Sequence, residues 1–196
     1  MRCRSRDLLV VAASGITVVV GARAARDGAL RDAEFRLFAR VNALSDRVFV
    51  PVWAVMQIGS LGGSIAIGAG VAVSGHRRLG RRVAAAGATT WLASKAVKPL
   101  AGRGRPAAVV EAARVLGRAQ TGPGYPSGHA AVAVAMASAA SPLVPRPWRP
   151  VLWSAALGVG VSRVYVGAHM PLDVDGGVLL GIGTERAIRL VAGPVA

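Results

Sequence analysis

The stretch SRVYVGAHMPLD, residues 162–173, lies between two apolar segments and contains Arg163, His169 and Asp173. An arginine, a histidine and a carboxylate are each costly at membrane depth. Three of them at one boundary therefore indicate a functional site rather than a solvated surface. The apolar segments on either side place this site at the ends of membrane helices, and the rest of the chain is interpreted from that placement.

Two earlier stretches complete the predicted site. The sequence PSGH, residues 126–129, brings a second histidine to the point where another apolar helix should begin. Lys98 is followed seven residues later by Arg105 and Pro106, which adds two cations. Together the three stretches predict a pocket for an anion that also contains two imidazoles.

The composition is that of a small integral membrane protein. The chain has 196 residues, of which 53% are hydrophobic and 17% are charged, and its mean hydropathy is +0.48. These values are too apolar for an ordinary soluble domain. The formal charge of +15 does not indicate nucleic acid, because the chain has only two Tyr and three Phe and no long basic run. Arginines that face anionic lipid explain the charge better.

The numbers and spacing of cysteine and histidine argue against disulfide bonds and metal sites. The single cysteine, Cys3, cannot form an internal disulfide, and no Cys/His cluster has zinc spacing. We therefore expect no disulfide, no metal and no cofactor.

The apolar runs predict an all-α fold, a polytopic membrane helical bundle with about six transmembrane helices in one domain over residues 1–196. The first run follows three arginines and leaves two alternatives open. It is either part of a cleaved signal peptide or a retained span that extends to residue 25 with Arg23 snorkelling. Pro51 and the glycine cluster at 59–63 should break the second span. The expected spans cover residues 8–22, 48–75, 83–98, 129–142, 151–161 and 171–191.

The polar segments predict the remaining architecture. Residues 26–47 alternate charged and apolar side chains at nearly helical spacing, which favours an amphipathic helix in the membrane interface over a solvated connector. Residues 76–82 form a basic loop. The connection over 101–125 is long enough to be functional, and its portion 111–118 is predicted to form a short helix that covers the site.

Topology decides on which side the predicted site lies. With the N-terminus in the cytoplasm, all three site stretches fall together on the extracytoplasmic side of what we expect to be a cell membrane. The basic residues are nearly balanced between the two sides, so the positive-inside rule gives this orientation only mild support. Removal of the first segment as a signal peptide would not move the site.

The PSGH stretch has two interpretations. Ser127 is a plausible N-cap of the following helix, Gly128 lets an anion approach closely, and the free N–H groups of the helix start then point at a phosphate. The alternative is an ordinary capped helix in which His129 is incidental.

The three cations also have two interpretations. Snorkelling is the commoner fate of a cation near a helix end, but cations recur at all three stretches on one side, which favours convergent phosphate contacts. Arg105 and Arg163 suit bidentate contacts to phosphate oxygens, whereas Lys98 acts as a point charge. Lys95 and Arg103 are interpreted as secondary or structural residues.

His169 is followed by Pro171, which fits the first turn of the last helix, and by Asp173 further into that turn. A carboxylate there can bind one imidazole nitrogen, fix the tautomer and leave the other nitrogen free as a nucleophile. The alternative is a buried histidine satisfied by a structural aspartate. Asp175 has no evident role and is interpreted as a helix-terminus or packing acid.

In order and spacing, these stretches resemble the three-part signature of the type 2 phosphatidic acid phosphatase (lipid phosphate phosphatase) superfamily, in its integral membrane branch. The matching segments are 98–106, 126–129 and 162–173. The resemblance implies a metal-independent phosphomonoesterase or pyrophosphatase that acts on a lipid, with the bilayer as its medium. Preorganised cations and N–H groups that stabilise charge on phosphorus agree with that activity.

The resemblance also implies a role for each site residue. His169 attacks phosphorus to form a phosphohistidine, Asp173 orients His169, and His129 protonates the leaving oxygen and then activates water. The residues that hold the phosphate oxygens are Lys98, Arg105, Ser127, Gly128 and Arg163.

Other functions and substrates remain open from the sequence. Vanadate-dependent haloperoxidases and soluble acid phosphatases share the signature, but the six apolar spans disfavour both. A catalytically silent membrane lipid-binding or assembly protein is the alternative from another class, although no motif position is missing. Candidate substrates are a polyprenyl pyrophosphate or prenyl-phosphate sugar, phosphatidic acid and phosphatidylglycerol phosphate, and an outward-facing site suits recycling of a polyprenyl carrier or cell-wall lipid. The sequence does not determine the oligomeric state.

Overall fold

The structure is a computed structural model that describes residues 2–28 and 30–193, and within these ranges its regular elements are all helices. The predicted all-α class is therefore confirmed. The α-helices are α1 (Arg2–Asp27), α2 (Arg31–Asn42), α3 (Phe49–Gln57), α4 (Leu61–Val73), α5 (Arg77–Ala101), α6 (Pro106–Val109), α7 (Gly128–Ala140), α8 (Arg149–Tyr165) and α9 (Pro171–Ala192). Single 3-10 turns at Asp46–Val48 and Arg146–Trp148 precede α3 and α8.

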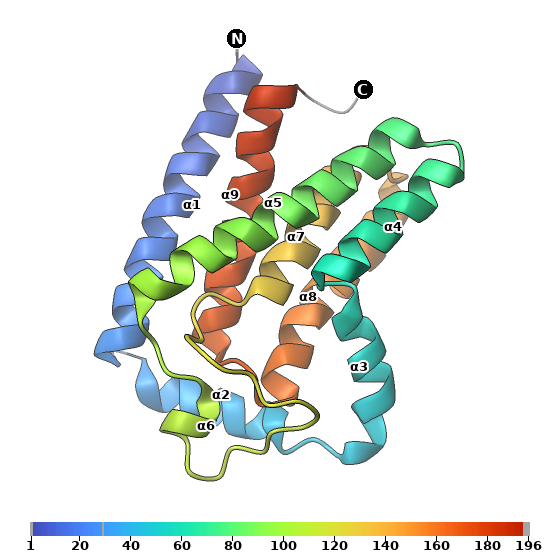
Figure 1. Cartoon of the computed structure of the whole chain (residues 1–196). Coiled ribbons are helices and arrows are strands. Elements are labelled where there is room, and N and C mark those ends of the chain that lie inside the picture. The colour runs from blue at the N-terminus through green and yellow to red at the C-terminus, as the bar shows by residue number, and fades with distance from the viewer. Residues whose placement is uncertain (1, 29, 194–196) are drawn as a thin grey trace.

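Helix α7 forms the centre of the bundle and packs against α5, α8 and α9 (Figure 1). Its side chains from Ala130 to Ala139 are all buried, and most are alanine or valine, so neighbouring helices can approach closely. A Cβ atom at Gly177 or Gly181 of α9 would overlap backbone oxygens of Ser127 and Ala131. The glycines therefore allow α9 to lie directly on α7.

Helix α1 runs beside α9 (Figure 1) and is joined to it at two levels. Near one end, Asp7 forms ion pairs with Arg186 and Arg189 at 3.7 and 3.5 Å. Further along α1, the hydroxyl of the buried Tyr125 donates a hydrogen bond of 2.8 Å to the carbonyl of Val18. Tyr125 immediately precedes the PSGH stretch, so α1 helps to hold the loop that leads into α7.

The two ends of the bundle differ in what they carry. Both chain termini and the turn between α4 and α5 lie at one end, whereas α2, α6 and the long loop before α7 lie at the other (Figure 1). All three predicted site stretches belong to this second end, which we call the site end.

Two predicted boundaries were wrong because arginine was read as loop. Residues 77–82 form the first turns of α5 rather than a basic loop, since arginine is a good helix former and the chain reverses at Gly75, with φ of 96°. Helix α8 continues to Tyr165, beyond the predicted end at residue 161, so Ser162 and Arg163 lie in its last turn.

The predicted helix over 111–118 is also wrong, and the reason lies in its backbone hydrogen bonds. The amide of Arg114 donates to Asn42 Oδ1 and its carbonyl accepts from Asn42 Nδ2, both at 2.9 Å, while the amide of Leu116 donates to the carbonyl of Val166 at 3.1 Å. These groups are therefore unavailable for helical bonds. The short helix is α6 instead, with Pro106 at its first position.

The predicted interfacial helix over 26–47 is shortened to α2, and residue 29 within that stretch lies outside the described residues. Among the helices that the structure describes, α1 is long and apolar enough to cross a membrane alone, over Arg4–Asp27. The segments Asp46–Gln57 and Leu61–Val73 pass only as a pair, bent by 64°, which agrees with the predicted break at 59–63. The count of six spans stays a prediction.

Candidate active site

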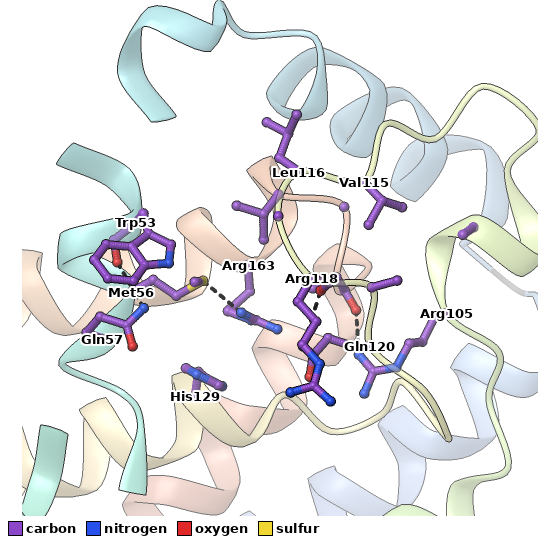
Figure 2. Close-up of a pocket in the computed structure, with 16 residues that line it drawn as sticks. Trp53, Met56, Gln57, Arg105, Val115, Leu116, Arg118, Gln120, His129 and Arg163 are labelled. Carbon is purple, nitrogen blue, oxygen red and sulfur yellow. Dashed lines mark hydrogen bonds between the residues drawn. The ribbon is translucent and has the colours of Figure 1, made fainter. Parts of the chain in front are cut away.

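A cavity of about 340 Å³ opens at the site end of the bundle. Arg105, His129 and Arg163, one from each predicted stretch, line it together with Trp53, Met56 and Gln57 of α3 (Figure 2). The opposite wall is the loop over 115–120, so the long connection does cover the site, although without a helix. None of the described lining residues is Asp or Glu, so no carboxylate neutralises the cations within the cavity wall.

Arg163 is a buried cation that has no anionic partner among the residues that the structure describes. Only 4% of its surface is exposed. Its Nη1 lies 2.7 Å from the Met56 sulfur, and its buried Nε has no hydrogen-bond partner among the described residues. A thioether is a weak acceptor, and a buried charge without a counter-charge is unfavourable. The geometry therefore suits an anionic ligand that binds in the cavity and contacts Arg163.

Arg105 is held at the cavity edge by two backbone carbonyls. Its Nη1 donates to Ala168 at 2.8 Å and its Nε donates to Gly122 at 3.0 Å. Burial lowers the pKa of Arg105 from its ordinary value, while the charge of Asp173 acts in the opposite direction. Arg105 stays a cation because arginine pKa values are so high, and its guanidinium keeps donors free for a ligand.

Lys98 occupies a different position from the two arginines. Its Nζ donates to the carbonyls of Pro123, Gly124 and Pro126 at 3.1, 3.1 and 3.0 Å. These contacts use all three ammonium donors, and Lys98 does not belong to the cavity lining. In this structure Lys98 therefore fastens the loop that leads into α7.

Ser127 occupies the N-cap position of α7, as predicted, but its hydroxyl makes no capping bond. Its Oγ is buried and has no partner among the described residues. A Cβ on Gly128 would lie 2.9 Å from Ser94 Oγ of α5, so glycine is also needed here for helix packing. The amide of Ser127 donates to the carbonyl of Asp173 at 2.7 Å, which joins the second stretch to the third.

His169 and Asp173 form the predicted pair. His169 Nδ1 lies 3.4 Å from Asp173 Oδ2, and the same oxygen accepts a hydrogen bond of 2.9 Å from the amide of Met170. A proton on Nδ1 that faces this carboxylate leaves Nε2 with a free lone pair. The pKa of His169 is lowered to about 4, mainly by burial and also by the nearby cations Arg163 and Lys98. The hydrogen bond to Asp173 and its charge raise the pKa, but by less than these effects lower it. His169 is therefore neutral near pH 7.

His169 differs from His129 in access. It is 3% exposed and is absent from the residues that line the cavity, whereas His129 faces the cavity directly. The structure thus brings His129, Arg105 and Arg163 around one space and holds the His169–Asp173 pair behind that wall.

A second layer supports Asp173 from the other side. Arg103 Nη1 donates to Asp173 Oδ1 at 3.0 Å, and Arg103 also pairs with Glu34 of α2 at 2.5 Å. Arg103 was predicted to be secondary or structural, and in the structure it contacts the site through its ion pair with Asp173. Within the described ranges, no group of three or more His, Cys, Asp or Glu side chains is arranged to hold a metal ion.

The family model of the PAP2 superfamily matches residues 79–193, more than half of the chain and all three site stretches. The chain belongs to the PAP2 superfamily. It is accordingly a membrane lipid phosphatase, a hydrolase of phosphomonoesters or lipid pyrophosphates. No curated protein sequence matches the chain.

Two solved structures share this PAP2 fold. The crystal structure of LpxE from Aquifex aeolicus is 23% identical, with a TM-score of 0.71 over 81% of this chain and 94% of that one. The first transmembrane PAP2 type phosphatidylglycerolphosphate phosphatase from Bacillus subtilis is 21% identical, with a TM-score of 0.74 over 91% of this chain and 94% of that one. Both support the transmembrane helical fold.

Sequence reasoning missed Glu34, although a signal for it existed. Glu34, Phe38 and Asn42 recur at four-residue spacing and form the buried side of α2. An acid in register with a buried phenylalanine indicates that the helix faces a polar partner rather than lipid alone. In this PAP2 protein that partner is Arg103, beside the site.

Proposed function

We propose that this PAP2 protein is a metal-independent, multi-pass cell-membrane phosphatase that works through a phosphohistidine, with its single catalytic domain open to the extracytoplasmic side. The observation that carries the proposal is the cavity, whose described lining residues include no acid and in which the buried Arg163 has no carboxylate partner among them. Such a site is electrostatically incomplete until an anion enters it. The adjacent His169–Asp173 pair supplies a nucleophile of the right kind.

In the proposed reaction, His169 Nε2 attacks phosphorus and the bond from phosphorus to the leaving oxygen breaks. Asp173 accepts the hydrogen bond from Nδ1 and stabilises the positive imidazole ring that results. His129, which starts this cycle as an imidazolium ion, gives its proton to the leaving oxygen, and the resulting neutral imidazole then takes a proton from water, whose oxygen attacks the phosphohistidine. Inorganic phosphate leaves, and both histidines return to their starting states.

The proposed phosphate ligands differ in whether they already face the cavity. Arg163 and Arg105 already face the cavity and would bind two equatorial oxygens, where charge develops in the transition state. The unpartnered Ser127 Oγ and the amide groups at Gly128 would contribute donors at the start of α7. Lys98 would have to exchange a backbone carbonyl for a phosphate oxygen, so its contact is the least direct.

Access to His169 adds a requirement to the proposal. Because His169 is 3% exposed, a phosphate can reach Nε2 only if the cavity wall shifts on binding. The loop over 115–120 forms much of that wall and is largely exposed. We propose that this loop moves when the lipid headgroup enters, which would also exclude water during transfer.

The proposed orientation rests on the distribution of arginines and on the contacts of α1, and the proposed substrate class follows from that orientation. Arginines of α5 and α9 gather at the end that carries both termini, which supports a cytoplasmic position for that end and an outward position for the site. Helix α1 contacts both α9 and Tyr125, which supports its retention as a span. A polyprenyl pyrophosphate or prenyl-phosphate sugar fits an outward site best, with phosphatidic acid and phosphatidylglycerol phosphate as the other candidates.

The test is phosphate release by the purified protein in detergent, measured against those lipids one at a time. We expect release from at least one of them, and no release from any in a His169→Ala variant that still folds. Release that is unchanged in the variant would refute the phosphohistidine. No release from any lipid by the wild-type protein would favour the catalytically silent alternative.

A further inference from the structure

Glu34 is a buried carboxylate on a helix whose exposed side is strongly charged. It is 5% exposed and belongs to the buried side of α2, together with Phe38 and Asn42. A buried carboxylate is unfavourable unless it is paired and hydrogen-bonded. Its partners therefore indicate why the chain keeps an acid at this position.

Among the described residues, the hydrogen-bond partners of the Glu34 carboxylate all belong to the site end. Oε1 accepts hydrogen bonds from Arg103 Nη1 at 3.0 Å and from the amide of Leu172 at 2.9 Å, and Oε2 accepts from Arg103 Nη2 at 2.5 Å. Leu172 is the second residue of α9, whose first amide groups have no helical partner. Glu34 thus fixes Arg103 in a two-pronged contact and also fixes the start of the helix that carries Asp173.

Arg103 also binds Asp173 and so connects Glu34 to it. Its Nη1 lies 3.0 Å from Asp173 Oδ1, while Asp173 Oδ2 faces His169 Nδ1. Burial lowers the pKa of Arg103, but the hydrogen bonds and charges of Glu34 and Asp173 outweigh burial, so its net pKa is raised. Arg103 is therefore a permanent cation between two carboxylates.

The charges of this row determine what His169 experiences. Asp173 alone would place one negative charge beside the imidazole, and Arg103 alone would cancel it. Glu34 offsets Arg103, so the row Glu34–Arg103–Asp173 keeps a net charge of −1. A net negative charge beside an imidazole favours its positive form, which develops when His169 attacks phosphorus.

We propose that Glu34 and Arg103 are positioning residues for the reaction, which hold Asp173 in place and keep the charge behind the His169 nucleophile at −1. This inference rests on the proposed function, because it assigns His169 the attacking role. Helix α2 is then part of the catalytic support rather than only an interfacial anchor.

Other charged groups also face His169 and must stay constant in any test. They are Arg163 of α8, Lys98 of α5 and His129 of α7, while Arg105 of the loop after α5 interacts with Asp173. None of these belongs to the row, and none is changed in the three charge variants, whereas His129→Gln serves only to assign a signal. Differences in the pKa of His169 between those variants therefore report the charges at positions 34 and 103.

The variants Glu34→Gln, Arg103→Gln and the double variant change the charge of the row in opposite directions. Glu34→Gln makes the row neutral, Arg103→Gln makes it −2, and the double variant restores −1. The pKa of His169 should fall in Glu34→Gln, rise in Arg103→Gln and return toward the wild-type value in the double variant. Each shift should be roughly half a unit to one unit, as for a single nearby charge in a partly screened site.

The measurement is histidine NMR on the full-length protein in detergent micelles. The chain has three histidines, so ¹⁵N-histidine labelling gives few signals, and His76→Gln and His129→Gln assign them. In parallel, kcat should fall at least about tenfold in Glu34→Gln with KM within about twofold, since a less basic nucleophile slows transfer rather than binding. The double variant should recover part of that loss.

Glu185→Gln is the matched control. Glu185 is also a buried carboxylate paired with an arginine, Arg82, and it lies on the same helix as Asp173. The two positions are twelve residues apart, about 18 Å along the helix. This variant should lower the thermal midpoint without moving the pKa of His169.

The outcomes separate this inference from the proposed function. If Glu34→Gln and the double variant show the same His169 pKa, or the double variant loses more activity than Glu34→Gln, the row is only structural and the inference is overturned. That comparison stands even if Arg103→Gln, with two unpaired buried carboxylates, fails to fold. If instead the pKa values shift as expected but His169→Ala keeps activity, the proposed function fails.

Discussion

Both ends of the bundle bury arginine side chains, but they differ in whether a carboxylate pairs with each buried arginine that the structure describes. At the end that carries the termini, Arg82 pairs with Glu185 at 3.3 Å, and Ser138 donates to the second oxygen of Glu185 at 3.1 Å. At the site end, Arg103 is paired in the same way, whereas the Arg163 guanidinium contacts the Met56 thioether and no carboxylate within the described part of the chain. Burial of a cation is therefore compatible with a purely structural role, and the absence of a carboxylate in the cavity wall is what distinguishes the site.

This difference predicts how substitutions at the two ends will diverge. Changes at the end that carries the termini should affect stability and leave the chemistry of each folded molecule intact. Changes around the cavity should do the reverse, because natural sites give up stability for function.

The largest expected effect is that of His169→Ala. Removal of the nucleophile should reduce kcat by at least about 10⁴-fold, since no neighbouring group can take its place. Phosphate release by the folded variant, compared with wild type on the same lipid, checks this. Activity within tenfold of wild type would show that His169 does not attack phosphorus.

His129→Ala should have a smaller effect that depends on the leaving group. General acid catalysis contributes about 10²- to 10⁴-fold, and p-nitrophenolate needs little protonation to leave. Loss of activity on an alkyl lipid phosphate should therefore exceed loss on p-nitrophenyl phosphate, measured as the ratio of kcat/KM values. Equal losses on both substrates, with binding of a phosphate analogue retained, would remove His129 from the role of leaving-group acid.

Arg163→Met and Arg82→Met form a matched pair across the two ends. Arg163→Met should lower kcat/KM by about 10²- to 10³-fold, as for loss of one transition-state donor, and leave the thermal midpoint unchanged or raised. Arg82→Met leaves Glu185 buried without its cation, which costs about 3–5 kcal/mol, but its activity per folded molecule should persist. Thermal unfolding and kinetics of both variants test the comparison, and a reversed pattern would contradict it.

Much of the fold and of the site could be predicted from the sequence, because local patterns mark them. The apolar runs predicted α7 and α9 nearly to the residue, because Ser127 and Pro171 mark their starts. The His169–Asp173 contact followed from a local four-residue spacing. Local patterns of this kind carry their own geometry.

The failures share a different cause, which is contact between residues far apart in sequence. The loop over 111–118 is extended because Asn42 captures the backbone of Arg114. Glu34 reaches Arg103 and Leu172 from a helix near the N-terminus. Lys98 is turned toward three loop carbonyls, which its motif position did not indicate. Such partners become visible only once the chain is folded.

Arg118→Gln should have a modest effect, because Arg118 lies on the exposed part of the cavity wall. Figure 2 shows its side chain directed toward the same space as Arg105 and Arg163. An exposed charge contributes little, of the order of 1 kcal/mol or less, so KM should rise severalfold with kcat unchanged. The rise should be larger for a pyrophosphate lipid than for a monophosphate, and identical kinetics on both would exclude Arg118 from headgroup binding.

The smallest expected effect is that of a chelator. The proposed reaction uses arginine and histidine for every charge that a metal would otherwise stabilise, so phosphate release should persist at the same rate in EDTA. A loss of activity that added Mg²⁺ or Zn²⁺ restores would contradict a metal-independent mechanism.

Direct detection of the covalent intermediate tests whether His169 is the nucleophile. His129→Ala should hydrolyse the phosphoenzyme slowly, because the group that activates water is gone, so brief incubation with ³²P-labelled p-nitrophenyl phosphate, whose leaving group needs little protonation, should leave label on the protein. The label should be stable in alkali, labile in acid, and located on His169 by mass spectrometry of the peptide. Transfer of label to water without any protein-bound phosphate, or label on a residue other than His169, would contradict the account.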